Sequence, residues 1–132
     1  MKHKKLLVGK LPPKLLVLPF VLIAIYSMLS IYAFVDAEGF YEVMEIPFPG
    51  HQFFIQSWAG KNTAMVAVLL LSTLSRRFLP LLIAMLMLLV GQAGDAVAGV
   101  RTDVNVFITY IALAITLVQI ICMHRWAKKA AK

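Results

Sequence analysis

The sequence predicts an all-α membrane protein, an antiparallel bundle of four transmembrane helices with both termini in the cytoplasm. Three observations predict this class. Apolar side chains make up 61% of the 132 residues and charged ones 14%, a composition far too apolar for a soluble domain of this length. Four apolar runs each approach the roughly 20 residues that a helix needs to cross a bilayer. Basic residues cluster at one end of these runs.

The four apolar runs form one predicted membrane domain, 1–132. The first run is longer than the apolar core of about 7–15 residues in a secretory signal, so we expect it to be retained as a helix. The second run is less apolar, because Lys61 lies in its first half. Short connections join the last three runs and predict antiparallel neighbours. The spans are expected at 15–35, 53–75, 78–99 and 104–123.

The distribution of Lys and Arg predicts the orientation, since short cytoplasmic loops retain these residues. Five N-terminal lysines, the pair Arg76 and Arg77, and four cations of the C-terminal tail would lie on one side. Only Arg101, with Lys61 near it, would lie on the other. We therefore expect a multi-pass protein of a bacterial cytoplasmic membrane. No aromatic side chains interleave with the basic clusters, so the net charge of +7 does not predict nucleic-acid binding.

The connection between the first two spans, 36–52, is predicted to be extracytoplasmic. Its aromatic and aliphatic residues alternate with Glu, and Pro47 and Pro49 would stop any helix that begins before them. An apolar segment too short to span is expected to lie in the membrane interface or to fold over the end of the bundle. Three roles are open for it: a cap, a lid over a lipophilic pocket, or a docking surface.

Two opposite charges are predicted at similar depth on neighbouring spans. At 1.5 Å per residue, Lys61 lies about 12 Å inward from Phe53, and Asp95 lies about 12 Å inward from Asp103. An isolated charge at the centre of a membrane helix costs about 2.5–3.5 kcal/mol on insertion scales. We therefore expect the two side chains to pair inside the bundle.

Other polar residues would surround this pair. Gln92 shares a helical face with Asp95, Asn62 adjoins Lys61, and two further polar residues begin the last span at similar height. The glycines and alanines around Asp95 and on the second span would let the helices approach closely. The predicted polar cluster therefore consists of Lys61, Asn62, Gln92, Asp95, Asn105 and Tyr110.

The predicted polar cluster has several interpretations. A buried ion pair would fix the register of the helices, whereas intramembrane ionisable residues often mark ligand sites or proton paths. One acid and one base do not make a proton relay. Asp95 as a base beside Lys61 would suit an enzyme, but no catalytic motif accompanies it, so the question of catalysis stays open. With one cysteine and no spaced histidines, the sequence predicts neither a metal nor a cofactor.

Several short motifs resemble those of the DoxX-like superfamily of small bacterial membrane proteins, in particular its branches without an assigned function. They are "FYxxM" and "PFP" after the first span, "WAGKN" at the start of the second, "SRR" at the inner turn and "GQAGDAVAG" near the end of the third. The resemblance covers about Ala33 to Met123. Gly94, Asp95 and Ala96 match the expected Gly-Asp-Ala, whereas Lys61 stands where an Arg is expected. Lys supplies a point charge in place of a bidentate guanidinium.

The resemblance implies a four-helix fold and a role beside other membrane proteins. Relatives include subunits linked to quinone-dependent sulfur oxidation, partners in redox assemblies, and assembly helpers. We therefore expect an accessory or assembly subunit that contacts lipid and a membrane-protein partner or a second copy of itself. The first alternative is a small enzyme or binder for a lipophilic molecule such as a quinone or isoprenoid. A dimeric transporter is the second alternative.

Overall fold

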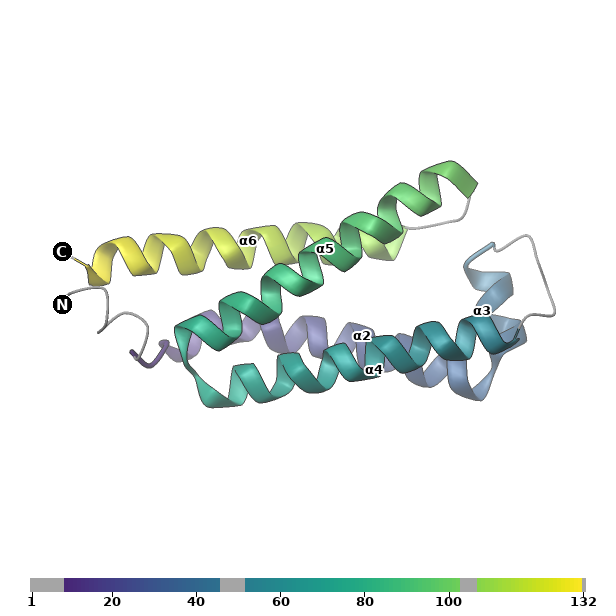
Figure 1. Cartoon of the computed structure of the whole chain (residues 1–132), viewed down its shortest axis with the longest axis horizontal. Helices are drawn as coiled ribbons and strands as arrows, with labels where there is room; N and C mark the ends of the chain where they lie inside the picture. Colours follow the sequence, from purple (N-terminus) through teal and green to yellow (C-terminus); the bar gives the residue numbers. More distant parts are fainter. Residues whose placement is uncertain (1–8, 46–51, 103–106, 132) are drawn as a thin grey trace.

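The computed structural model describes residues 9–45, 52–102 and 107–131, and these are mainly helical (Figure 1). A short 3-10 helix leads into the first long helix, and a helix of seven residues separates the first two long ones. The elements are η1 (Pro13–Leu16), α2 (Val17–Val35), α3 (Ala37–Val43), α4 (Gln52–Ser75), α5 (Phe78–Thr102) and α6 (Phe107–Ala130).

Three helical segments are long and apolar enough to cross a membrane, as found among the described residues: Pro13–Val35, Phe78–Arg101 and Phe107–Ala130. The chain is therefore an all-α, multi-pass membrane protein. Helices suit this setting because each satisfies its backbone hydrogen bonds within itself. α4 is of similar length but is not one of the three, and its first half carries the polar residues Gln56, Lys61 and Asn62.

The helices extend beyond two of the expected span ends. α5 continues past Gly99 to Thr102, and α6 continues past Met123 to Ala130. The sequence after Met123 is rich in Ala, Lys and Arg, which have high helix propensity. Lys128 and Lys129 also lie in the last turn of α6, where cations interact favourably with the helix dipole.

The long helices pack as two pairs (Figure 1), with α2 mainly against α4 and α5 mainly against α6. Arg76 and Arg77 form the tight turn between α4 and α5. Arg76 has a positive φ of 54°, and its backbone carbonyl accepts a hydrogen bond of 2.7 Å from the Leu11 N–H. The Arg76 guanidinium donates to the Leu11 carbonyl at 3.1 Å, and the Gln119 amide donates to the Leu15 carbonyl at 2.7 Å. These bonds fasten the segment before α2 to one end of the bundle.

Most charged residues lie at one or the other end of the bundle, whereas Lys61, Asp95 and Arg101 belong to the parts of α4 and α5 in the acidic half. We call the end with the α4–α5 turn the basic end, because the described cations there are Lys10, Lys14, Arg76, Arg77, Arg125, Lys128 and Lys129. The opposite end, which holds α3, is the acidic end, with Asp36, Glu38, Glu42 and Glu45.

Two apolar clusters form the core. The larger lies in the basic half and the middle of the bundle, and it includes Leu22, Leu69 and Met85. The smaller lies at the acidic end, where Ala33, Ile55 and other side chains of α2, α3 and α4 meet. The core is therefore not continuous along the axis, and polar side chains lie between its two parts.

The smaller cluster forms because α3 folds across the end of α2 and α4. Asp36 caps α3 by accepting a hydrogen bond of 2.9 Å from the Gly39 N–H. Phe40 is 2% exposed and contacts the rings of Tyr32 and Trp58, with centroid distances of 5.9 Å and 5.3 Å. α3 thus covers the bundle end, as expected for a cap, whereas the expected roles as lid and docking surface stay predictions.

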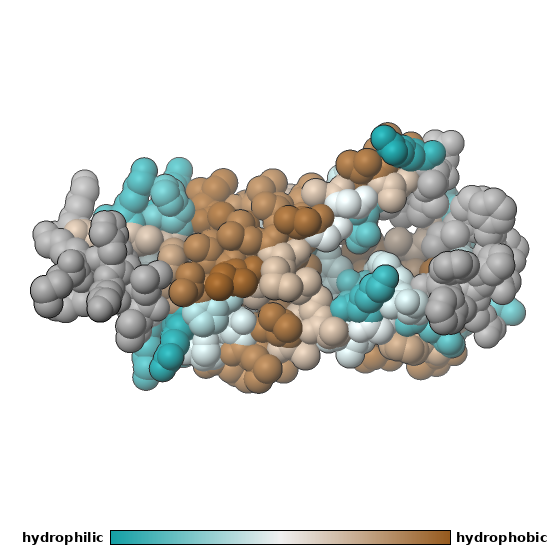
Figure 2. All heavy atoms as spheres, in the orientation of Figure 1, coloured by the Kyte–Doolittle hydropathy of each residue, from teal (hydrophilic) through white to brown (hydrophobic). Residues whose placement is uncertain are grey.

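α5 does not remain beside α4 over its whole length (Figure 1). It leaves the α4–α5 turn close to α4 and runs obliquely toward the start of α6. Figure 2 shows a hollow between the two helices in the acidic half of the molecule, bordered by hydrophilic and intermediate residues. The oblique course of α5 therefore separates it from α4 in the acidic half of the bundle.

Candidate functional site between α2, α4 and α5

Gln92 of α5 is the most deeply buried member of the predicted polar cluster. Its side chain is 1% exposed, and its amide nitrogen donates a hydrogen bond of 3.0 Å to the Tyr26 hydroxyl on α2. The amide oxygen has no hydrogen-bond partner within the described structure. Gln92 therefore offers one free acceptor in the interior of the bundle.

Ser30 and Asn62 are the other buried polar groups at this level. The Ser30 hydroxyl and the Asn62 amide nitrogen are both buried without a partner in the described part of the chain. α2 and α4 are antiparallel, and Tyr26 shares one apolar cluster with Met65 while Ala33 shares the other with Ala59. Ser30 and Asn62 lie between these two levels and therefore face the same layer of the bundle.

We group five residues at a similar level of the three helices as the interhelical polar site: Tyr26, Ser30, Asn62, Gln92 and Asp95. The hydrogen bond between Gln92 and Tyr26 connects α5 to α2 at this level. Tyr26 and Ser30 are four residues apart on one face of α2, and Gln92 and Asp95 are three apart on one face of α5. The site lies in the gap between the two apolar clusters. Each unpaired buried polar group lowers the stability of the folded protein by about 1–3 kcal/mol, and a hydrogen bond to a bound partner would offset this loss.

Asp95 lies at the margin of the interhelical polar site. Its side chain is half-buried, and it lies within electrostatic range of the Tyr26 hydroxyl. Carboxylate oxygens accept hydrogen bonds only, so Asp95 adds a second acceptor beside that of Gln92. Asp95 is the one carboxylate of the apolar helix α5, and it lies near the C-terminal end of that helix.

The expected ion pair between Lys61 and Asp95 is not present. Lys61 is exposed, and no hydrogen bond or salt bridge between these two described residues is found. Consecutive residues of an α-helix point about 100° apart, so burying Asn62 turns Lys61 away from the interior. The arrangement of a carboxylate base beside an ammonium group is therefore also not formed.

Two other members of the predicted polar cluster are not part of the interhelical polar site. Tyr110 is 45% exposed on α6, away from the interior, and Asn105 lies outside the described residues.

The expectation that glycines bring helices together is wrong at three positions. A Cβ added at Gly60, Gly91 or Gly94 would have no neighbour within 4 Å. All three glycines are exposed.

Tyr26 and Ser30 were not among the residues predicted from the sequence. Both occur in the continuous apolar run of the first span, where a tyrosine and a serine are compatible with simple packing. Their spacing of four residues within a membrane span is the signal that would have shown a shared polar face. That spacing could not predict which residue contacts Tyr26, since Tyr26 and Gln92 are far apart in the chain.

The chemistry of the interhelical polar site is that of hydrogen bonding. It offers the acceptors of Gln92 and Asp95, the donor of Asn62, and the Ser30 hydroxyl, which both donates and accepts. No group of three or more His, Cys, Asp or Glu residues able to hold a metal occurs among the described residues. Such a site suits a molecule that carries both a donor and an acceptor.

In comparisons with known proteins, the chain matches no family model, no curated protein and no solved structure.

Proposed function

We propose that the protein binds the polar head of a lipophilic molecule in the interhelical polar site. The observation that carries this proposal is the set of three buried, unpaired polar atoms on Ser30, Asn62 and Gln92. Buried polar groups are nearly always hydrogen-bonded, so three unpaired ones at a similar level of the bundle favour a bound partner. The apolar surroundings favour an apolar body on that partner, as in most small-molecule sites.

The hollow between α4 and α5 supports the same proposal (Figure 2), because α4 carries Asn62 and α5 carries Gln92 and Asp95. A molecule dissolved in the bilayer would reach the site sideways from the hydrocarbon. Its head group would accept from Asn62 and donate to Gln92 or Asp95. A hydroxyl or another small group with both capacities fits this set, as the head groups of reduced quinones and of isoprenoid alcohols do.

Ser30→Ala is the sharpest test of this proposal. Without a ligand, removing an unpaired buried hydroxyl is expected to leave stability unchanged or slightly raised. With a ligand, it removes a contact, so the compound that co-purifies with the protein in nanodiscs should be depleted. Organic extraction followed by mass spectrometry measures this, with Thr63→Ala as the control, because its hydroxyl is already bonded to the Ala59 carbonyl at 2.8 Å.

The wild-type extract should contain one enriched lipophilic compound, and Asp95→Ala should lose it as Ser30→Ala does. Extracts of equal composition from all four proteins would contradict the proposal. Ordered water would then satisfy the unpaired atoms, since a polar cavity of this kind is able to hold it.

An accessory or assembly subunit is the second candidate function, and the open faces of Gly60, Gly91 and Gly94 favour it. Small residues on a membrane helix allow close approach of another helix, and here no described helix of this chain occupies that space. A partner recovered in fixed stoichiometry, released by Gly91→Leu and retained by Ser30→Ala, would support this function. A self-associated dimer without partner or compound would favour the transporter. The DoxX-like resemblance is compatible with each.

We also propose that α4 is a fourth span and that both chain ends face the cytoplasm, because seven of the nine described Lys and Arg residues lie at the basic end. Reporter fusions after Ala131 and in the Arg76–Arg77 turn are expected to give a cytoplasmic signal. Fusions in the 46–51 connection are expected to give the opposite signal. A cytoplasmic signal from that connection would contradict the topology.

A further inference from the structure

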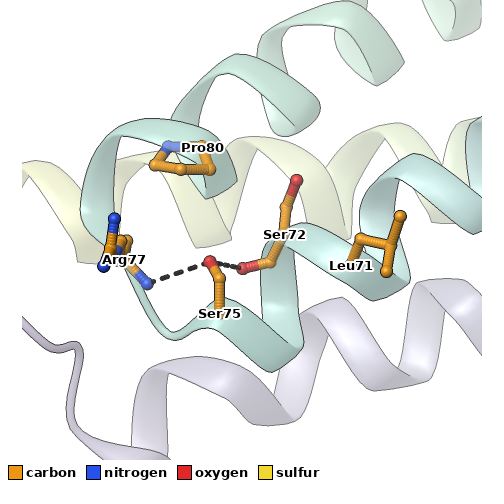
Figure 3. Close-up of a pocket in the computed structure, with 5 residues that line it drawn as sticks. All are labelled: Leu71, Ser72, Ser75, Arg77 and Pro80. Carbon is orange, nitrogen blue, oxygen red and sulfur yellow. Dashed lines mark hydrogen bonds between the residues drawn. The ribbon is translucent and has the colours of Figure 1, made fainter.

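A pocket of about 410 Å³ lies where α4 turns into α5, and Leu71, Ser72, Ser75, Arg77 and Pro80 line it (Figure 3). It is at the basic end, far along the bundle from the interhelical polar site. Its lining combines two hydroxyls and a guanidinium with two apolar side chains. Such a mixture suits a molecule with an anionic head and an apolar body.

The polar groups of this pocket differ in whether they are already hydrogen-bonded within the protein. Ser75 is already engaged, since its hydroxyl donates to the Ser72 carbonyl at 2.7 Å and accepts from the Arg77 N–H at 3.3 Å. Ser72 is largely buried, and its hydroxyl points away from these two bonds toward the side where Pro80 lies (Figure 3). The Arg77 side chain lies on the other side of Ser75 in this view, with Pro80 above it. The free donors of the pocket are therefore the Ser72 hydroxyl and the Arg77 guanidinium.

The surrounding charge favours an anion in this pocket. Lys10 is bridged to Arg77 through the backbone, which adds a second cation beside the first. The Asp and Glu residues of the described chain are Asp36, Glu38, Glu42, Glu45 and Asp95, and none lies in the basic half. No described carboxylate therefore competes for the Arg77 guanidinium.

The apolar surface beside the pocket favours a lipid tail. Leu71 is 70% exposed and Leu74 is 60% exposed, both on the outer face of α4. The place of a lipid tail here rests on the proposal that α4 is a fourth span, in which such side chains would contact hydrocarbon. An occupant that places its charge at Arg77 would therefore extend its apolar part along Leu71.

We propose that this pocket binds an anionic phospholipid, with the phosphate at Arg77 and Ser72 and an acyl chain along Leu71. Arg and hydroxyl donors are suited to phosphate oxygens, and charge-assisted hydrogen bonds are stronger than neutral ones. Basic pockets between membrane helices are a recurrent way of holding acidic head groups. The site is separate from the interhelical polar site, so the phospholipid proposal does not depend on a ligand there, although it does rest on the proposed span α4.

Lipid binding to the detergent-purified protein, measured by native mass spectrometry with phosphatidylglycerol and phosphatidylcholine as probes, tests this proposal. The wild type is expected to retain phosphatidylglycerol preferentially. Arg77→Gln should weaken that binding about fivefold, as for one cation near an acidic lipid. Ser72→Ala should weaken it about threefold, as for one interhelical hydrogen bond. Arg125→Gln, which removes the same charge from an exposed position on α6, should leave it nearly unchanged.

Equal weakening by Arg77→Gln and Arg125→Gln would overturn the proposal, because binding would then depend only on the total charge of the basic end. Inorganic phosphate that displaces phosphatidylglycerol at equal concentration would overturn it as well, since the occupant would be a soluble anion. A change of oligomeric state in Arg77→Gln would indicate a second copy of the chain in place of the lipid. Arg77→Gln is expected to fold, because the described bonds of Arg77 are made by its backbone.

Discussion

Phe40→Ala is expected to lower the free energy of unfolding by about 3–5 kcal/mol, the usual cost of truncating a fully buried aromatic side chain. Phe40 fills the centre of the smaller apolar cluster, between the rings of Tyr32 and Trp58. Its removal would leave a cavity beneath α3 and detach that helix from the bundle end. Unfolding in mixed detergent micelles, followed by circular dichroism, measures the change.

Val43→Ala is the matched control, because Val43 lies on the same short helix and is 56% exposed. Substitutions of exposed residues away from special features change stability by about 0.5 kcal/mol or less. Losses of similar size in the two variants would show that α3 does not pack on the bundle as described. The difference between them therefore reports the contribution of the cap itself.

Gln92→Ala is expected to cost about 2–4 kcal/mol, because it opens a cavity at a side chain that is 1% exposed and leaves the Tyr26 hydroxyl without its partner. A double-mutant cycle with Tyr26→Phe and Gln92→Leu separates the hydrogen bond from the lost volume. We expect a coupling energy of about 0.6 kcal/mol, the average for hydrogen bonds between membrane helices. Equilibrium unfolding of the four proteins in the same micelles measures it.

Gln56→Ala is the control for losing a glutamine side chain, since Gln56 is exposed on α4. It is expected to leave stability within about 0.5 kcal/mol of the wild type. Strictly additive effects of Tyr26→Phe and Gln92→Leu would mean that the two side chains do not interact. Additivity would also mean that the Tyr26 hydroxyl does not hold the Gln92 amide group in place. Nothing would then direct the free amide oxygen into the interhelical polar site.

The residues that lie near one another along an axis were predictable, whereas those that meet across the bundle were not. The similar depth of Lys61 and Asp95 followed from counting 1.5 Å per residue. Depth does not determine which way a helix is rotated about its axis. The structure turns Asn62 inward and Lys61 outward, and it brings Gln92 to Tyr26.

The sequence alone determined the helical class, because apolar runs of span length leave the backbone no other way to satisfy its hydrogen bonds in lipid. It also predicted the α4–α5 turn at Arg76 and Arg77 and a Gln92 side chain buried inside the bundle. Only the tertiary structure decided the oblique course of α5 and the exposure of Gly60, Gly91 and Gly94, where an added Cβ would meet no described atom within 4 Å. That course depends on how all the side chains of two helices pack together, and no local pattern of one helix contains this information.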